Sequence, residues 1–214
     1  VAAGKKRPLL LLPVEEIATP REFVEKITAD PDGEFKLTAD LDFTETGYTT
    51  IPLLIGVLDG QNHTIANLTC NDTTLNYASA GLFGSLTGTG RNVKMTDVNI
   101  TSTHYAGAIV GYSSANAATI ENCSVVGGTI TSTPELIGEE YDNGDKVGGI
   151  IGYCVNGDSV TGCSVKNVVI KGYRDVGGVI GYANGAVEIL NNTIEASEVV
   201  CDSTHNYKNY ASEN

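Results

Sequence analysis

The sequence predicts an all-β protein: a right-handed parallel β-helix (β-solenoid) with three strands per coil and a short N-terminal capping helix. Three observations predict this fold. Glycine is abundant, with 25 of 214 residues, and β-branched residues are plentiful, as expected for short strands joined by sharp turns. A glycine-rich motif recurs along the chain. Apolar residues also fall in register between the copies, which is the signature of stacked repeats.

The glycine-rich motif occurs four times, as AGLFG (80–84), AGAIVGY (106–112), VGGIIGY (147–153) and VGGVIGY (176–182). The last glycines of the copies are 27, 41 and 29 residues apart, which indicates an insertion at 131–146 in the second, longest interval. Glycine between strands permits the positive φ that sharp corners need. A coil of about 27–29 residues suits three short strands and three turns.

A second, alternating segment follows each copy of the motif, at 92–100, 122–130, 162–170 and 191–199. One apolar column contains Met95, Val125, Val165 and Ile194, a second contains Ile100, Ile130, Ile170 and Val199, and a third contains Val93, Cys123, Cys163 and Asn192. If each copy is one coil, equivalent positions stack about 4.8 Å apart and form a continuous core. We align residues 65–70 as an earlier copy, with Leu68 matching Val93 and Cys70 matching Met95.

The N-terminal part contains a helix signal. Thr19, Pro20 and Glu22 supply an N-cap, a proline in the first turn and a capping-box acid. We therefore predict a helix at 20–29 that covers the N-terminal end of the solenoid, followed by a first strand at 35–43. The expected organisation is a tail at 1–18, one solenoid domain at 19–201, and a tail or cut edge at 202–214.

The charge and the hydropathy of the sequence argue against a nucleic-acid partner and against a membrane-spanning segment. The formal net charge is −13, and such an excess of acid repels polyphosphates, so we expect no nucleic-acid partner. The longest apolar stretch, at 9–14, is far below the roughly 18 residues of a membrane span. It follows a basic cluster but is too short for a signal-peptide core. We expect a processed chain whose export signal has been removed.

Several motifs together resemble a known family. They are VLDGQNHTIANLT (57–69), GLFG (81–84), the VGGIIGY and VGGVIGY copies, and NCSV and GCSV in the second segments. Over roughly residues 19–200 the chain resembles the GLUG-motif repeat family, which occurs in bacterial surface and secreted proteins, including Bacteroides adhesins and regions of immunoglobulin A peptidases. The resemblance implies a β-solenoid on an exported protein, either secreted or anchored to the outer membrane, and it implies no catalytic residue.

The most interesting candidate site is a column of tyrosines at the ends of three motif copies, Tyr112, Tyr153 and Tyr182. Aromatic rings with hydroxyl groups can form a platform for sugar rings. The alternative is a structural ladder in which the rings pack on one another. Apolar residues flank the tyrosines at both alternations, so the sequence leaves open which side of the strand faces solvent.

Acidic residues provide weaker candidates. The insertion carries Glu139, Glu140, Asp142 and Asp145, whose oxygens could hold calcium, although their spacing does not fit an EF-hand and a solvated loop is favoured. Asp97 aligns with Gly127 and Asn167, and Glu121 aligns with Arg91 and Thr161, so neither column provides paired carboxylates. Asp40 and Asp42 share one face of the predicted first strand.

The expected function is a non-enzymatic cell-surface or secreted module. It would be an adhesin or stalk that binds host glycans, mucin or an extracellular protein, with no catalytic residue and no required cofactor. Two alternatives stay open. One is a polysaccharide-active β-helix enzyme of the lyase or glycoside hydrolase type, and the other is a scaffold region of a larger secreted peptidase.

Overall fold

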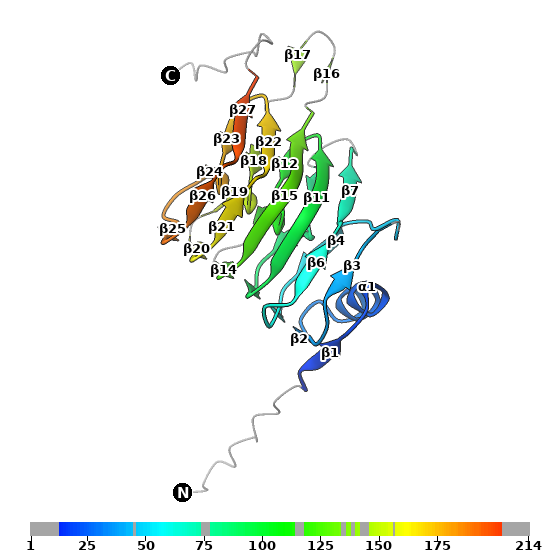
Figure 1. The fold of residues 1–214 in the computed structure, drawn as a ribbon. Coiled ribbons are helices and arrows are strands. Elements are labelled where there is room, and N and C mark those ends of the chain that lie inside the picture. Colours follow the sequence, from blue (N-terminus) through cyan, green and yellow to red (C-terminus); the bar gives the residue numbers. More distant parts are fainter. Residues whose placement is uncertain are drawn as a thin grey trace, which may run out of the picture.

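The computed structural model describes residues 13–44, 46–73, 78–113, 118–133, 136–137, 140–141, 146–155 and 157–202. In this part of the chain the fold is all-β with one short helix, and successive coils stack along one axis from the N-terminal to the C-terminal end (Figure 1). The strands that stack on one another pair in parallel.

The strands of the stack form four sheets. Sheet A contains, in spatial order, β1 (Glu15–Ile17), β2 (Glu34–Leu37), β5 (Val57–Asp59), β10 (Thr89–Arg91), β14 (Thr119–Glu121), β20 (Ser159–Thr161) and β25 (Glu188–Leu190). Sheet B contains β3 (Leu41–Asp42), β6 (Thr64–Ala66), β11 (Lys94–Ser102), β15 (Ser124–Ser132), β21 (Ser164–Lys166) and β26 (Thr193–Glu195). Its second half adds β7 (Thr69–Asp72), β22 (Val169–Gly172) and β27 (Glu198–Cys201).

Two further sheets come from the glycine-rich motif. Sheet C contains β4 (Ile51–Leu54), β9 (Phe83–Leu86), β13 (Val110–Ser113), β19 (Ile151–Cys154) and β24 (Ile180–Ala183). Sheet D contains β8 (Ser79–Ala80), β12 (Tyr105–Ala106), β18 (Lys146–Gly148) and β23 (Asp175–Gly177). Within the predicted insertion, β16 (Leu136–Ile137) and β17 (Glu140–Tyr141) pair antiparallel.

Each full coil runs through sheets D, C, A and B in that order, so the predicted three strands per coil are not confirmed. The reason is a bend inside the glycine-rich motif, which we had counted as one strand. The bend brings each sheet C strand so close to the sheet D strand of the preceding coil that a side chain has no room at the motif's last glycine. A Cβ added to Gly152 would lie 2.9 Å from the backbone nitrogen of Ala106, and one added to Gly181 would lie 2.6 Å from that of Val147.

The predicted apolar columns of sheet B are confirmed. Met95 pairs with Val125, Val125 with Val165, and Val165 with Ile194, while the second column pairs in the predicted register from Ile100 to Val199. Val125 and Val165 are at most 1% exposed. Each coil therefore buries its inner face against its neighbours, and the core is continuous along the stack.

The earlier part of the chain departs from the predicted register. Met95 pairs with Ile65, and Cys70 pairs with Ile100 rather than Met95. The predicted alignment treated residues 65–70 as one strand, whereas the corner at Asn67, with φ 58°, divides them between β6 and β7 and changes which side chains face inward. The predicted strand at 35–43 is two short strands, β2 in sheet A and β3 in sheet B. Strand β1, inside the expected tail at 1–18, pairs with β2.

Helix α1 (Pro20–Ala29) has the predicted bounds. The Thr19 side chain accepts a hydrogen bond from the backbone nitrogen of Glu22, as an N-cap should. Phe23 and Ile27 are fully buried, and the Phe23 ring lies 5.9 Å from Phe43 and 6.1 Å from Phe83. The helix covers the N-terminal end of the stack (Figure 1). The described part of the chain contains no helix that is long and apolar enough to cross a membrane.

Two columns of residues with positive φ form the corners around sheet B. The first, between sheets A and B, contains Asn62, Asn92, Asn122, Gly162 and Asn191; the second, midway along sheet B, contains Asn67, Asp97, Gly127, Asn167 and Ala196. Glycine adopts this left-handed conformation without penalty, and asparagine and aspartate tolerate it best among the other residues. The backbone at the corners therefore explains the recurrence of asparagine in the sequence.

Candidate functional site

The structure brings the three predicted tyrosines together. Tyr112, Tyr153 and Tyr182 occupy equivalent positions of β13, β19 and β24, and each pairs with the next. The ring centroids of Tyr112 and Tyr153 are 5.2 Å apart, and those of Tyr153 and Tyr182 are 5.4 Å apart with nearly parallel rings. We call these three residues the tyrosine ladder. Its rings pack on one another, as the structural interpretation predicts.

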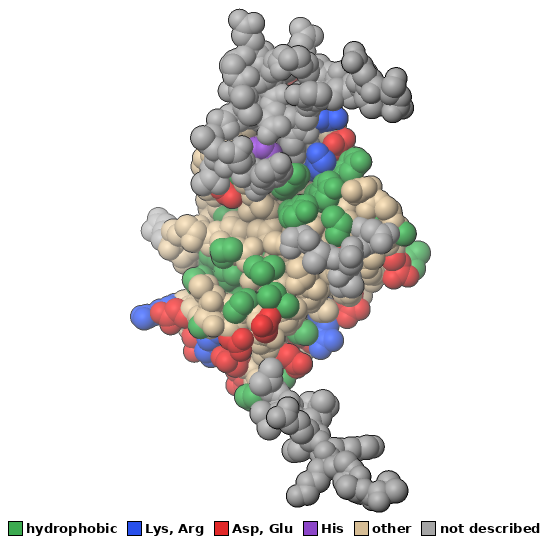
Figure 2. Space-filling model, turned by 180° about the vertical axis from the view of Figure 1, so that it is seen from behind, with side chains coloured by type: hydrophobic (Ala, Val, Ile, Leu, Met, Phe, Trp, Pro, Cys, Tyr) green, Lys and Arg blue, Asp and Glu red, His purple; other side chains and the backbone are tan. Residues whose placement is uncertain are grey.

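The ladder lies on the outer side of sheet C. Tyr112 and Tyr153 are partly exposed and Tyr182 is 40% exposed, whereas the next residues along the first two strands, Ser113 and Cys154, are completely buried. This settles the orientation that the sequence left open. Figure 2 shows the molecule from behind, where hydrophobic side chains, with tyrosine counted among them, gather in separate patches between charged groups.

Sheet D supplies a second column that faces the ladder, consisting of Ser79, Tyr105, Lys146 and Asp175. The Tyr105 ring lies 5.2 Å from Tyr112 and 5.6 Å from Tyr153. Lys146 Nζ lies 5.4 Å from the Tyr182 ring centroid, within cation–π range, and 3.6 Å from Asp175. The sequence analysis missed this column, although each member directly precedes a copy of the glycine-rich motif.

A pocket of about 470 Å³ lies at the N-terminal end of the ladder. It is lined by Thr50, Pro52, Leu53, Asp72, Ser79, Gly84, Ser85 and Tyr112. Ser85 pairs with Tyr112, and Leu53 pairs with Ser85, so the pocket continues the line of the ladder into the first coils. We call it the Tyr112 pocket. It combines one aromatic ring, aliphatic groups and a few polar groups, which is the usual composition of a small-molecule site.

Burial and nearby groups keep the Tyr112 hydroxyl neutral. The pKa of Tyr112 is raised, because partial burial disfavours the phenolate, and Tyr153 and Asp158 nearby add to this effect. A neutral hydroxyl can both donate and accept hydrogen bonds. Asn184 Nδ2 already donates to the Tyr153 hydroxyl over 3.1 Å. The ladder can therefore offer apolar ring surface together with hydrogen-bonding groups.

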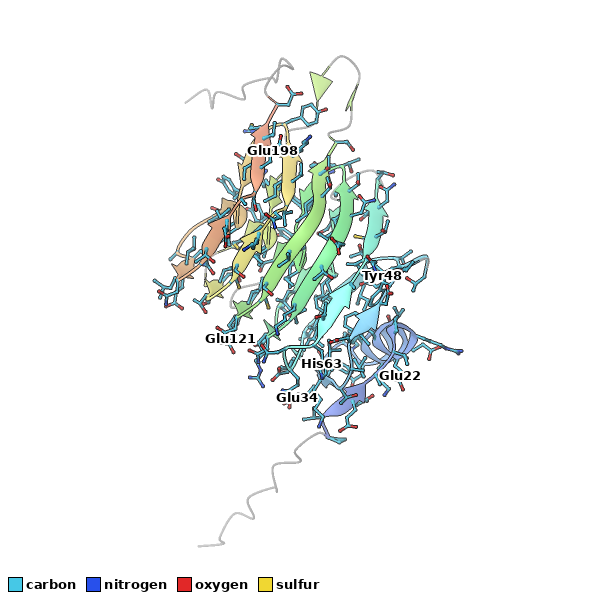
Figure 3. The ribbon with its side chains drawn as sticks, viewed as in Figure 1. Glu22, Glu34, Tyr48, His63, Glu121 and Glu198 are labelled. Carbon is cyan, nitrogen blue, oxygen red and sulfur yellow. The ribbon has the colours of Figure 1, made fainter. Side chains whose placement is uncertain are left out.

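The acidic candidates are not brought together in the described structure. Glu139, Asp142 and Asp145 lie outside the described residues, and Glu140 is described only by its backbone in β17, so the calcium hypothesis stays a prediction. Where the structure is described, no group of three or more His, Cys, Asp or Glu side chains could hold a metal. Among the glutamates labelled in Figure 3, Glu198 lies toward the opposite end of the stack from Glu22, Glu34 and Glu121.

Other acids are engaged locally. Glu121 pairs with Arg91 and Thr161, as predicted. Asp40 accepts a hydrogen bond from the Thr64 backbone nitrogen over 2.8 Å, and Asp42 accepts hydrogen bonds from Thr44 and from the Asn67 side chain. These two carboxylates fasten one coil to the next.

Comparison with known families identifies the repeat. Residues 102–131 match the family model of the GLUG motif. The chain carries a GLUG motif. The matched GLUG segment runs from the end of β11, through β12, β13 and β14, to the end of β15, so it is one complete turn of the stack. It contains Tyr105 and Tyr112, and therefore part of both facing columns.

A search of curated proteins gives no match. Among solved structures, a protein described as a putative immunoglobulin A1 protease from Bacteroides ovatus is similar, with a TM-score of 0.66 and 19% sequence identity. The similarity covers 86% of this chain and 57% of that one, so the GLUG-containing chain spans little more than half the length of its structural relative. At this identity the likeness shows the fold alone.

Proposed function

We propose that this chain is a non-enzymatic module of a secreted or cell-surface protein, and that it binds glycans on the outer side of sheets C and D. The observation that carries the proposal is the tyrosine ladder, which is exposed next to Tyr105, Lys146 and the Tyr112 pocket. The GLUG motif and the Bacteroides relative support the assignment to an exported protein.

The chemistry of this surface favours sugars. The apolar faces of a sugar ring pack on aromatic rings, while its hydroxyls need neutral donors and acceptors such as tyrosine and asparagine side chains. The net charge of −13 opposes strongly anionic ligands. Neutral glycans on mucin or on another extracellular glycoprotein are therefore the proposed partners, and the role is that of an adhesin or stalk.

The proposal includes the handedness of the coils. We expect right-handed winding, because connections between parallel strands are right-handed in about 98% of cases. An experimental structure of the chain measures the winding directly, and left-handed coils would contradict this expectation.

A glycan array and a mucin pull-down test the binding proposal. Wild-type protein is expected to bind neutral oligosaccharides, and Tyr182→Ala is expected to bind about tenfold more weakly, equivalent to about 1.4 kcal/mol. Because Tyr182 is 40% exposed, its removal should change the melting temperature little. Val126→Ala, at an exposed position of sheet B, is the matched control. If folded wild-type protein binds no glycan, the adhesin role is wrong and a spacer role is left.

A second candidate is a scaffold region of a larger secreted peptidase. The observation that favours it is the structural relative, of which this chain covers 57%. Cleavage of immunoglobulin A1 by the full-length gene product, compared with a form lacking residues 13–202, tests this candidate. Cleavage that depends on the module would support it, and the absence of cleavage would contradict it.

A further inference from the structure

The Tyr112 pocket exists because one coil has small residues where the following coils have large ones. In the ladder column, the coil before Tyr112 has Ser85 at the position that Tyr112, Tyr153 and Tyr182 occupy in the following coils. In the facing column, the same coil has Ser79 at the position that Tyr105, Lys146 and Asp175 occupy in the following coils. Two serines therefore face each other in the coil that contains β8 and β9, and both line the pocket.

One face of the Tyr112 ring is directed toward this pocket. The centroids of Tyr105, Tyr112 and Tyr153 form a nearly equilateral triangle with sides of 5.2, 5.2 and 5.6 Å. Rings on opposite faces of Tyr112 would be about twice as far from each other, at the usual stacking distance of about 5 Å. Tyr105 and Tyr153 therefore lie on the same side of Tyr112, and Ser85 and the pocket lie on the other side.

We propose that the Tyr112 pocket is a subsite for one neutral pyranose ring, which stacks on Tyr112 in the place where Ser85 leaves the ladder without a ring. This inference rests on the proposed glycan-binding function and specifies its ligand. The volume of about 470 Å³ lies within the range of roughly 300–1,000 Å³ that is typical of small-molecule sites.

The polar groups of the pocket favour a neutral sugar over an acidic one. Asp72 is the charged residue among those that line it, and a carboxylate repels sialic acid, uronic acids and sulfated sugars while accepting hydrogen bonds from hydroxyl groups. Asp72 Oδ2 accepts a hydrogen bond from the Ser79 backbone nitrogen over 3.0 Å, and the Ser79 hydroxyl donates to the Gly84 carbonyl over 2.5 Å. These bonds hold the acceptor groups in place before a ligand arrives.

The ladder itself suggests the decisive variant. In Ser85→Tyr, the new ring continues the column of tyrosines and occupies the space assigned to the sugar. The matched control is Ser164→Tyr, at a partly exposed position of sheet B on another side of the stack. Asp72→Asn provides a second test that keeps the shape of the pocket and removes its charge.

Ligand-observed NMR with glucose, galactose, N-acetylglucosamine and sialic acid measures binding to each folded variant. We expect the wild type and Ser164→Tyr to bind at least one neutral sugar and not sialic acid. We expect Ser85→Tyr to lose at least tenfold in affinity without a lower melting temperature, and Asp72→Asn to lose several-fold.

Each contrary result is specific. Neutral-sugar binding that Ser85→Tyr and Asp72→Asn leave unchanged would overturn the subsite, while a loss in Tyr182→Ala would still support the ladder function. Equal binding of sialic acid would overturn the preference for a neutral ring. Binding of N-acetyltyrosinamide instead of sugars, blocked by Ser85→Tyr, would assign the pocket to an aromatic peptide side chain. No binding of any glycan by the wild type would overturn the proposed function itself.

Discussion

Single residues at the corners of the coils show how backbone conformation selects the sequence. In the second corner column, Ala196 has φ 48°, where earlier coils place Asn67 and Asn167 at 58° and 54°. The left-handed conformation costs an ordinary L-residue about 1–2 kcal/mol, and asparagine recovers part of this through local hydrogen bonds. Ala196 is therefore a strained copy of a position that is better filled elsewhere in the stack.

This strain predicts a stabilising substitution. Ala196→Asn is expected to raise the free energy of unfolding by up to about 1 kcal/mol, because the new residue tolerates the corner conformation. The midpoint of chemical denaturation measures the change. Ala186→Asn, at a position without positive φ, is the control. An equal gain in both variants would show that the effect does not come from the corner.

The corner residue Asn67 also makes the stability of the fold depend on pH, because its side chain donates a hydrogen bond to the Asp42 carboxylate. Hydrogen bonds from the Asn67 side chain, and then from the Thr44 side chain and backbone, lower the pKa of Asp42 from 3.8 to about 2. These bonds favour the ionised form, so their stabilising effect is fully present above about pH 4, the ordinary pKa, and is lost as the pH falls through about 2.

Asp42→Asn tests this coupling. The variant is expected to melt at a lower temperature than the wild type at pH 6, and the difference is expected to shrink as the pH falls from 4 to 2. Melting curves at a series of pH values follow the difference. A difference that stays constant down to pH 2 would show that the carboxylate charge is not responsible.

At the scale of the strand, alternation separates the core from the surface within one residue. Val125 is completely buried and Val126 is 38% exposed, although both belong to β15. Val125→Asp is expected to unfold the protein, because an unpaired carboxylate in the core costs several kcal/mol. Val126→Asp should change the stability by only about 0.5 kcal/mol. Circular dichroism melting compares the two, and an unchanged melting curve for Val125→Asp would contradict the inward orientation.

The elements that could be predicted are those in which a single local rule decides. The columns through Val125 and Ile130 have strict period two, and the cap at Thr19 begins the helix at Pro20. The bend between sheets D and C could not be predicted, because the residues around it, such as Ile150 and Ile151, are apolar at both alternations and both are buried.

The candidate site was predicted only in part, for a related reason. The tyrosine ladder follows from one repeating motif, so its register could be read along the sequence. The Tyr112 pocket depends on Ser79 and Ser85, which belong to different sheets. Only the bend brings them together, and small residues inside a repeat do not by themselves indicate a pocket.

At the scale of the whole molecule, each coil is stabilised by its immediate neighbours. In the coil formed by β18–β22, Val160, Val165 and Ile170 are at most 1% exposed. Their partners in the next coil, Ile189, Ile194 and Val199, are 49%, 52% and 43% exposed. Among the described strands, β24, β25 and β26 are the last of their sheets. Burial of these columns, and with it the hydrophobic stabilisation, is therefore complete in the middle of the stack and about halved in the coil that contains β25, β26 and β27.

This gradient predicts that opening begins at the coil that contains β23–β27. In a stack with nearest-neighbour stabilisation, the coil with one stabilising interface has the lowest local free energy of opening. Native-state hydrogen exchange should therefore show the fastest backbone exchange in β24–β27 and the slowest in β11 and β15. Two substitutions in the same column check the cause. Ile65→Ala, at a fully buried position, is expected to cost about 2–5 kcal/mol, and Ile194→Ala clearly less. Equal costs, or uniform protection along the stack, would mean that the coils open as a single unit.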